Sequence, residues 1–288
     1  MLHADIAAEP SPAAMLASGA GPAGGSLSVL DRNNVRITGR GARAIIFAHG
    51  FGCDQNMWRL VAPAFEDGYR TILFDQVGAG GSDLSAYSTE RYGNLSGYAT
   101  DLLEICAELD LRDAIFVGHS VSAMIGVLAS LADPARFSAL VLVSPSPRYI
   151  DDGAYQGGFS AADIEDLLAS LADNHLGWSA MMAPVIMGNP DRPELGEELT
   201  NSFCRTDPAI ARDFARVTFT SDNRDDLARV KMRTLILQCR EDSIAPIEVG
   251  QYVHDAIAGS TMVVLDATGH CPNLSAPAAV TDAIRAFV

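Results

Sequence analysis

The sequence has few basic residues. Only 20 lysines and arginines stand against 36 aspartates and glutamates, which gives a formal net charge of −16 at pH 7. Nucleic acids and anionic membrane surfaces carry the same sign of charge and would repel such a protein. We therefore expect a soluble protein whose partners include neither nucleic acid nor a membrane.

Closely spaced cysteines are also absent. The chain has five, an odd number, and no two have C-x-x-C spacing. A disulfide framework or a structural zinc site needs paired or clustered cysteines, and the spacing of His119, His270 and Cys271 does not fit metal ligands either. We expect no metal site, and the scattered thiols favour a cytoplasmic location.

Long hydrophobic runs are missing as well. Apolar runs such as residues 44–48 and 139–143 are far shorter than the ~20 residues that cross a bilayer. The N-terminal segment lacks the basic start and the solid apolar block of a cleaved signal peptide. Because it is rich in alanine, proline and glycine, we interpret residues 1–27 as a flexible tail.

The chain is instead built from short apolar segments rich in β-branched residues and leucine. They lie at residues 43–50, 70–76, 114–120, 139–145, 233–239 and 261–267. Such continuous runs are typical of parallel strands buried on both faces. Helical patterns lie between them, and in one of these Tyr98, Leu102, Ile105 and Leu109 share a face. The alternation predicts a mostly parallel, doubly wound α/β sheet, with a strand-like segment already from about residue 28.

Residues 147–222 interrupt this alternation. Their pattern indicates about four short helices and no strand, and Arg192-Pro193 and Asp207-Pro208 are typical helix starts. We predict a helical cap, inserted into a core made of residues 28–146 and 223–288. Most apolar side chains of the cap are expected to hold it together, and others are candidates to line a pocket. These apolar residues include Trp178, Met181, Met182, Phe203, Phe214 and Phe219.

The segment FVGHSVSAMIG, residues 116–126, predicts a buried strand that turns into a helix at Ser120. A sharp turn of this kind projects a serine hydroxyl from the carboxyl edge of the sheet, where a neighbouring base can activate it as a nucleophile. Ser122 stands where the G-x-S-x-G pattern has its second glycine. Because serine is small, we interpret the segment as a nucleophile elbow rather than as a purely structural turn.

A base and an acid follow later strands in the order that such a serine needs. His270 follows the segment 261–267, and the adjacent Glu241 and Asp242 follow the segment 233–239. The order Ser…Asp…His is typical of serine hydrolases with this alternating architecture. It predicts Ser120 as nucleophile, His270 as base and Asp242 as the acid that orients the imidazole, with Glu241 as the alternative acid.

Donors for an oxyanion are expected from the segment H-G-F-G, residues 49–52. Glycines on both sides of Phe51 allow backbone N–H groups to turn towards the site. We assign the oxyanion hole to the N–H groups of Phe51 and Val121, and we expect His49 to shape the loop. The segment 78–82 lacks the third glycine of a dinucleotide-binding loop, so no cofactor is expected.

Several longer motifs resemble the RsbQ family of α/β-hydrolases, which comprises a bacterial stress-response regulator and the plant karrikin and strigolactone receptors. They are HGFGCDQNMW, LFDQVGAGGSDLSAY, FVGHSVSAMIG and GHCPNLS, and the similarity extends over about residues 28–288. The plant receptors also have serine at the position of Ser122. The resemblance implies an α/β-hydrolase fold in which a four-helix cap covers an apolar pocket.

The resemblance also implies a function. Ser120, Asp242 and His270 would cleave a small hydrophobic ester or lactone-like ligand slowly, in stress or small-molecule signalling, and a PAS-containing protein phosphatase would be the partner. We select Phe51, Trp178 and Phe219 as candidates for contact with the substrate. Two alternatives stay open: an ordinary metabolic carboxylesterase or lactonase, and a ligand-binding sensor with vestigial catalysis.

Overall fold

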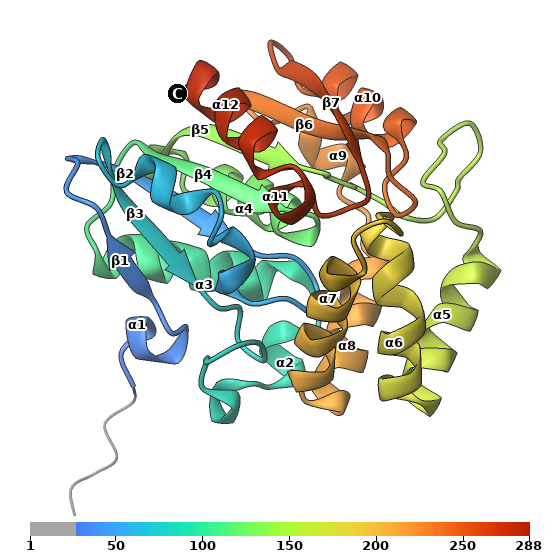
Figure 1. The fold of residues 1–288 in the computed structure, drawn as a ribbon. Coiled ribbons are helices and arrows are strands. Elements are labelled where there is room, and N and C mark those ends of the chain that lie inside the picture. Colours follow the sequence, from blue (N-terminus) through green and yellow to red (C-terminus); the bar gives the residue numbers. More distant parts are fainter. Residues whose placement is uncertain (1–26) are drawn as a thin grey trace, which may run out of the picture.

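A computed structural model describes residues 27–288, and Figure 1 shows how its helices surround a central sheet. The predicted flexible tail, residues 1–27, lies outside the described residues except for Leu27, so it stays a prediction. Among residues 27–288, no helix is both long enough and apolar enough to cross a membrane.

The sheet has seven strands in the described part of the chain, in the order β1-β3-β2-β4-β5-β6-β7. All neighbouring strands are parallel except β1, which pairs antiparallel with β3. The fold class predicted from the sequence is therefore confirmed. The strands are β1 Arg36–Thr38, β2 Arg43–Ala48, β3 Tyr69–Phe74, β4 Ala114–His119, β5 Phe137–Val143, β6 Arg233–Glu241 and β7 Thr261–Thr268.

Two hydrophobic clusters form the core, one on each face of the sheet. Side chains of a strand alternate between faces, so Ile46 of β2 belongs to one cluster and Phe47 to the other. The cluster around Ile46 is covered by α3 (Leu95–Glu108), α4 (Val121–Ala132), α9 (Arg224–Leu227) and α10 (Ile247–Ala256). The opposite cluster is covered by α12 (Pro277–Phe287) and by short 3-10 turns at Gln55–Trp58 and Ala62–Phe65.

The helical face predicted for α3 packs as expected. Tyr98, Leu102 and Ile105 are fully buried against the sheet, and Leu109 is the partly buried C-terminal cap residue. The start of the chain differs from the expectation of a strand-like segment from about residue 28. Val29–Arg32 form the short helix α1, which Ser28 caps through its side chain, and the strand β1 begins only at Arg36.

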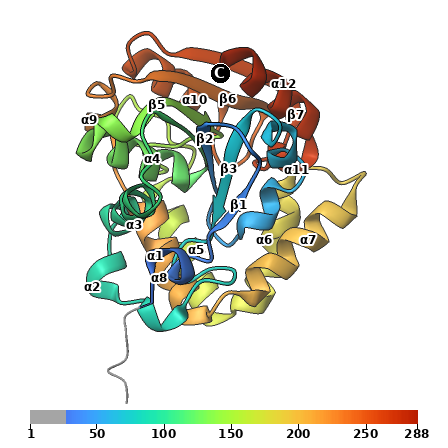
Figure 2. The ribbon, with the colours of Figure 1, turned by 90° about the vertical axis from the view of Figure 1, so that its left-hand side faces the viewer.

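Four helices follow one another between β5 and β6, as the sequence predicted. They are α5 Ala161–Asp173, α6 His175–Met187, α7 Pro193–Arg205 and α8 Pro208–Thr220. The prolines at the starts of α7 and α8 occupy the first helical position, where a missing N–H costs nothing. Figures 1 and 2 both show these helices grouped to one side of the sheet. We refer to α5–α8 as the cap; its predicted boundaries at residues 147 and 222 stay predictions.

The remaining helices are short and connect the larger elements. They are α2 Thr89–Tyr92, α11 Pro272–Ser275 and two 3-10 turns at Leu84–Ala86 and Pro134–Arg136. Before the cap, the loop 147–160 contains only isolated bridges, which pair Ile150 with Phe159 and Asp152 with Tyr155. The loop buries the side chain of Tyr149 under the cap, close to the end of β4.

Candidate active site

Ser120 lies at a sharp turn between β4 and α4. Its φ of +56° and ψ of −125° are rare for a residue with a side chain, and such a conformation costs about 1–3 kcal/mol. The backbone is held there from both sides, because the N–H of Ser120 donates to Val143 on the neighbouring strand and the Ser120 carbonyl accepts from Ala123. The sheet and the helix therefore fix the direction of the serine side chain.

The turn also requires glycine where the chain segments touch. A Cβ atom on Gly118 would lie 2.6 Å from the carbonyl oxygen of Ser122, and one on Gly126 would lie 2.1 Å from the ring of Phe116. Both distances are far below any real carbon contact, so β4 and α4 can approach each other this closely only at these glycines. This close approach explains why the sequence has glycine at positions 118 and 126.

Ser122 fits the turn and adds two hydrogen bonds to it. Its Oγ donates to the carbonyl oxygen of His49 at 2.5 Å and accepts from Nε2 of Gln76 at 3.1 Å. The ring of His49 accepts at Nε2 from the N–H of Gln76, which leaves Nδ1 to donate to the carbonyl of Gly50. Ser122 thus connects the helix that follows Ser120 with the loop after β2, and His49 shapes that loop through its neutral ring.

His270 lies next to the Ser120 hydroxyl. It follows β7 and the tight turn at Gly269, and its Nε2 is 2.8 Å from Oγ of Ser120. The backbone N–H of His270 donates to the carbonyl oxygen of Ile186, near the end of α6. A Cβ atom on Gly269 would lie only 1.8 Å from the carbonyl oxygen of Met187, so glycine is required where this loop meets the cap.

Asp242 holds the other side of the imidazole. Its Oδ2 is 2.8 Å from Nδ1 of His270, while its Oδ1 accepts from the N–H groups of Ile244 and Ala245. Burial by itself would raise the pKa of the Asp242 carboxyl, but the charge of His270 and these hydrogen bonds outweigh it and hold the pKa below its ordinary value. The alternative acid, Glu241, is exposed, and among residues 27–288 its carboxylate accepts a hydrogen bond only from Thr268.

The ring of His119 holds the His270 loop in place through a hydrogen bond. Its Nε2 lies 2.7 Å from the carbonyl oxygen of His270, so this nitrogen carries the proton and donates. Burial, followed by the nearby charge of His270, lowers the pKa of His119 to about 3. The ring is therefore neutral at physiological pH, and its Nδ1 has no hydrogen-bond partner among the described residues.

The loop after β2 brings Phe51 to the same place. A Cβ atom on Gly50 would lie 3.1 Å from Cβ of Ser120, and one on Gly52 would meet the ring of Phe203 at 2.0 Å. The loop therefore passes directly beside the serine, below the cap. Within residues 27–288, the N–H groups of Phe51 and Val121, the two predicted oxyanion donors, donate no hydrogen bond.

A small cavity of about 30 Å³ adjoins the Ser120 hydroxyl and the His270 ring. Phe51 and Phe219, two of the three side chains selected as substrate contacts, line it. The third, Trp178, does not line this cavity; it is buried behind, with its ring edge-on to Phe51 at 6.3 Å. Phe203, one of the apolar cap residues considered for a pocket, lines it as well. The remaining lining residues were not predicted as pocket residues from the sequence, and they are Cys53, His119, Tyr149, Ile186, Leu199, Thr218, Ile244 and Cys271.

The side chains of Tyr149, Cys53 and Cys271 fill space in the cavity wall and are not reactive groups. The Tyr149 hydroxyl lies 3.4 Å from Oγ of Ser120, and burial raises its pKa above the ordinary value. Burial likewise raises the pKa of the Cys53 and Cys271 thiols, so both stay protonated and unreactive. All five cysteines are free thiols, and residues 27–288 contain no group of three or more histidine, cysteine or acidic side chains arranged to hold a metal ion.

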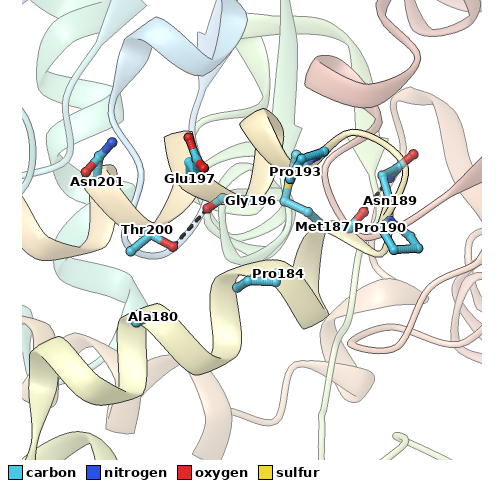
Figure 3. A pocket seen from close by; sticks show the side chains of 10 residues that line it. All are labelled: Ala180, Pro184, Met187, Asn189, Pro190, Pro193, Gly196, Glu197, Thr200 and Asn201. Carbon is cyan, nitrogen blue, oxygen red and sulfur yellow. Dashed lines mark hydrogen bonds between the residues drawn. The ribbon is translucent and has the colours of Figure 1, made fainter.

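A larger hollow of about 630 Å³ lies between α6 and α7 (Figure 3). Pro184 of α6 and Gly196 of α7 line it at the point where the two helices pack closely, since a Cβ atom on Gly196 would lie 3.3 Å from Cα of Pro184. None of the side chains around Ser120 lines it. The hollow borders the His270 loop indirectly, because Asn189 at its end donates through Nδ2 to the carbonyl of Thr268 at 2.9 Å. The larger hollow is therefore separate from the cavity beside Ser120.

The lowered pKa of His119 predicts a specific dependence of stability on pH. Between pH 6.5 and 3 the unfolded chain binds a proton at His119 that the folded protein excludes, so the free energy of unfolding falls as the pH falls through this window. Replacement His119→Asn removes the titration and retains an N–H donor. Between pH 7 and pH 4.5, we expect the free energy of unfolding, measured with urea, to fall by about 2 kcal/mol less in this variant than in the parent protein. Equal losses in both proteins would show that His119 does not titrate in this way.

Comparisons with known proteins agree with this architecture. Residues 45–283 match the model of the "Alpha/beta hydrolase family". The chain is 38% identical over 250 residues to the Karrikin insensitive 2 receptor CA of Petunia hybrida, covering 86% of this chain and 93% of that one. It is also 38% identical over 259 residues to the Strigolactone esterase D14 of Arabidopsis thaliana, covering 90% and 97% of the two chains.

A solved structure of a hydrolase from Oleispira antarctica superposes on this fold with a TM-score of 0.88 and 42% identity, covering 90% of this chain and 95% of that one. The match therefore includes the core sheet and the segment between β5 and β6. By its sequence, its sheet and its similarity to these proteins, the chain belongs to the α/β-hydrolase family.

Proposed function

We propose that the protein is a serine hydrolase of the RsbQ type, which cleaves a small ester or lactone-like ligand with Ser120, His270 and Asp242 as its catalytic triad. The observation that carries the proposal is the continuous line of hydrogen bonds from Ser120 Oγ through both ring nitrogens of His270 to Asp242, at 2.8 Å each. This line gives a serine hydroxyl what it lacks at neutral pH, a base oriented to take its proton.

In the proposed reaction, Ser120 Oγ attacks the carbonyl carbon of the ligand while Nε2 of His270 takes the hydroxyl proton. The tetrahedral intermediate expels the alcohol, which receives that proton from the imidazolium, and an acyl-enzyme remains. Water then attacks the acyl-enzyme, with His270 again as base, and releases the acid. Asp242, whose carboxyl stays ionised because its pKa is lowered, stabilises the imidazolium in both steps.

The oxyanion of the tetrahedral intermediate needs donors that have no other partner. The N–H groups of Phe51 and Val121 meet this requirement, and Val121 is also the first residue of α4, where the helix dipole favours negative charge. Ser122 would act indirectly in this scheme, because its bond to the carbonyl of His49 keeps the Phe51 loop beside the helix.

The cavity favours a small, largely apolar acyl group. Its volume of about 30 Å³ is well below the ~300–1,000 Å³ of pockets that enclose drug-sized ligands. A larger ligand would have to displace side chains of the cap such as Phe203 and Phe219. Such a displacement before each turnover agrees with the slow hydrolysis that we propose.

A role in stress or small-molecule signalling is the second part of the proposal. It is supported by the names of two relatives at 38% identity, one a karrikin-related receptor and the other a strigolactone esterase. We propose that a protein partner reads the occupied state, and a PAS-containing protein phosphatase, as in the bacterial members of the family, is the candidate. A metabolic esterase or lactonase is the alternative function, because the same triad would serve a signalling enzyme and a metabolic one.

The triad is tested by Ser120→Ala. Without the nucleophile, hydrolysis of p-nitrophenyl acetate should fall by at least ~10⁴-fold, while the folded structure stays intact. The matched control is Ser130→Ala in α4, the helix that follows Ser120; within residues 27–288 this buried serine's hydroxyl donates only to the carbonyl of Val127. It should retain the parental rate. Hydrolysis by the Ser120→Ala protein at the parental rate would refute the mechanism.

The turnover number separates the three functions that this fold can serve. Over a series of short esters and lactones, we expect Ser120-dependent turnover that is orders of magnitude slower than ~10 s⁻¹, the median for enzymes. A value near that median would favour the metabolic esterase or lactonase. Binding of ligands without any Ser120-dependent turnover would favour a sensor with vestigial catalysis.

A further inference from the structure

The hydroxyl of Thr218, a residue of the cavity wall, has no partner among residues 27–288. Thr218 lies in the last turn of α8, its side chain is buried, and it lines the cavity beside Ser120 and His270. Phe219, Leu199 and Ile186 are apolar side chains of the same cavity wall and offer the hydroxyl no partner.

Threonines elsewhere in the cap use their hydroxyl differently. Thr220, two residues further along α8, donates to the carbonyl of Arg216 at 2.7 Å, and Thr200 of α7 donates to the carbonyl of Gly196 at 2.9 Å. This bond to the preceding turn is the usual way for a helical threonine to satisfy its hydroxyl. Thr218 does not make it, although it belongs to the same helix as Thr220.

An unpaired buried hydroxyl weakens the folded protein unless something pairs with it. Valine has nearly the same shape and would fill the same space without this penalty. Ser120, His270 and Tyr149, three other polar side chains close to the reaction, already contact one another. Nδ1 of His119 also has no partner among the described residues, but Gly50 lies against it, where a Cβ atom would be only 2.7 Å away. The Thr218 hydroxyl is therefore available to a ligand that enters from the cap side of the cavity.

We propose that Thr218 determines substrate specificity by donating a hydrogen bond to a second oxygen of the ligand, distinct from the carbonyl oxygen that reacts. The inference rests on the proposed function and narrows its substrate class to small esters or lactones that carry an additional carbonyl, ether or hydroxyl oxygen in the acyl part. The proposed oxyanion donors come from the loop after β2 and from the start of α4, whereas Thr218 comes from α8, so different elements would recognise the two oxygens.

The test compares two ligands of nearly equal shape, p-nitrophenyl 4-oxopentanoate and p-nitrophenyl 4-methylpentanoate. Affinity for the intact esters is measured in the Ser120→Ala protein, alone and combined with Thr218→Val or with the control Thr220→Val. We expect Thr218→Val to reduce the preference for the oxo ester by roughly 10-fold, because its carbonyl loses a hydrogen-bond donor. Thr220 is exposed, and its replacement should change the preference less than twofold.

Thermal unfolding of the single variants supplies a second readout. Removal of an unpaired hydroxyl should leave the melting temperature of Thr218→Val equal to that of the parent or a few degrees higher. An unchanged preference between the two esters, or a melting temperature several degrees lower, would overturn the inference. Failure of the proposed function would look different, because the parent would then show no Ser120-dependent hydrolysis whatever the binding preference.

Discussion

The backbone of Ser120 is the constraint on which the rest of the site depends. A left-handed residue at the junction of a strand and a helix is unfavourable by itself, and it persists because the sheet and α4 hold it from both sides. The same turn forces β4 and α4 so close together that Gly118 and Gly126 admit no side chain. This turn places the serine hydroxyl at the edge of the sheet, next to the start of α4.

The cap is joined to this centre by its backbone as well as by its side chains. The carbonyl oxygen of Ile186 accepts from the N–H of His270, and Gly269 packs directly on Met187. The end of α6 and the proposed base are therefore in direct backbone contact, so the cap meets the core at the loop that carries His270.

Much of this arrangement is predictable from the sequence, for identifiable reasons. Buried parallel strands give unbroken apolar runs, and the order of Ser120, Asp242 and His270 follows from which strand each residue succeeds. Strand β1 escapes such reasoning because its three residues are largely exposed and carry no periodic signal. Inside the cap, Phe219 faces the cavity while Trp178 lies behind it, a difference set by how each helix is rotated in the packed structure. Hydrophobicity alone cannot make that distinction, nor can it find the buried hydroxyl of Thr218.

Covalent labelling tests most directly whether Ser120 is an activated nucleophile. A fluorophosphonate reacts with a serine only when a base takes its proton, so intact-protein and peptide mass spectrometry should find one adduct per chain, on Ser120. The adduct should form far more slowly in a His270→Ala variant. A parent protein that stays unlabelled, or one labelled at another residue, would contradict the account.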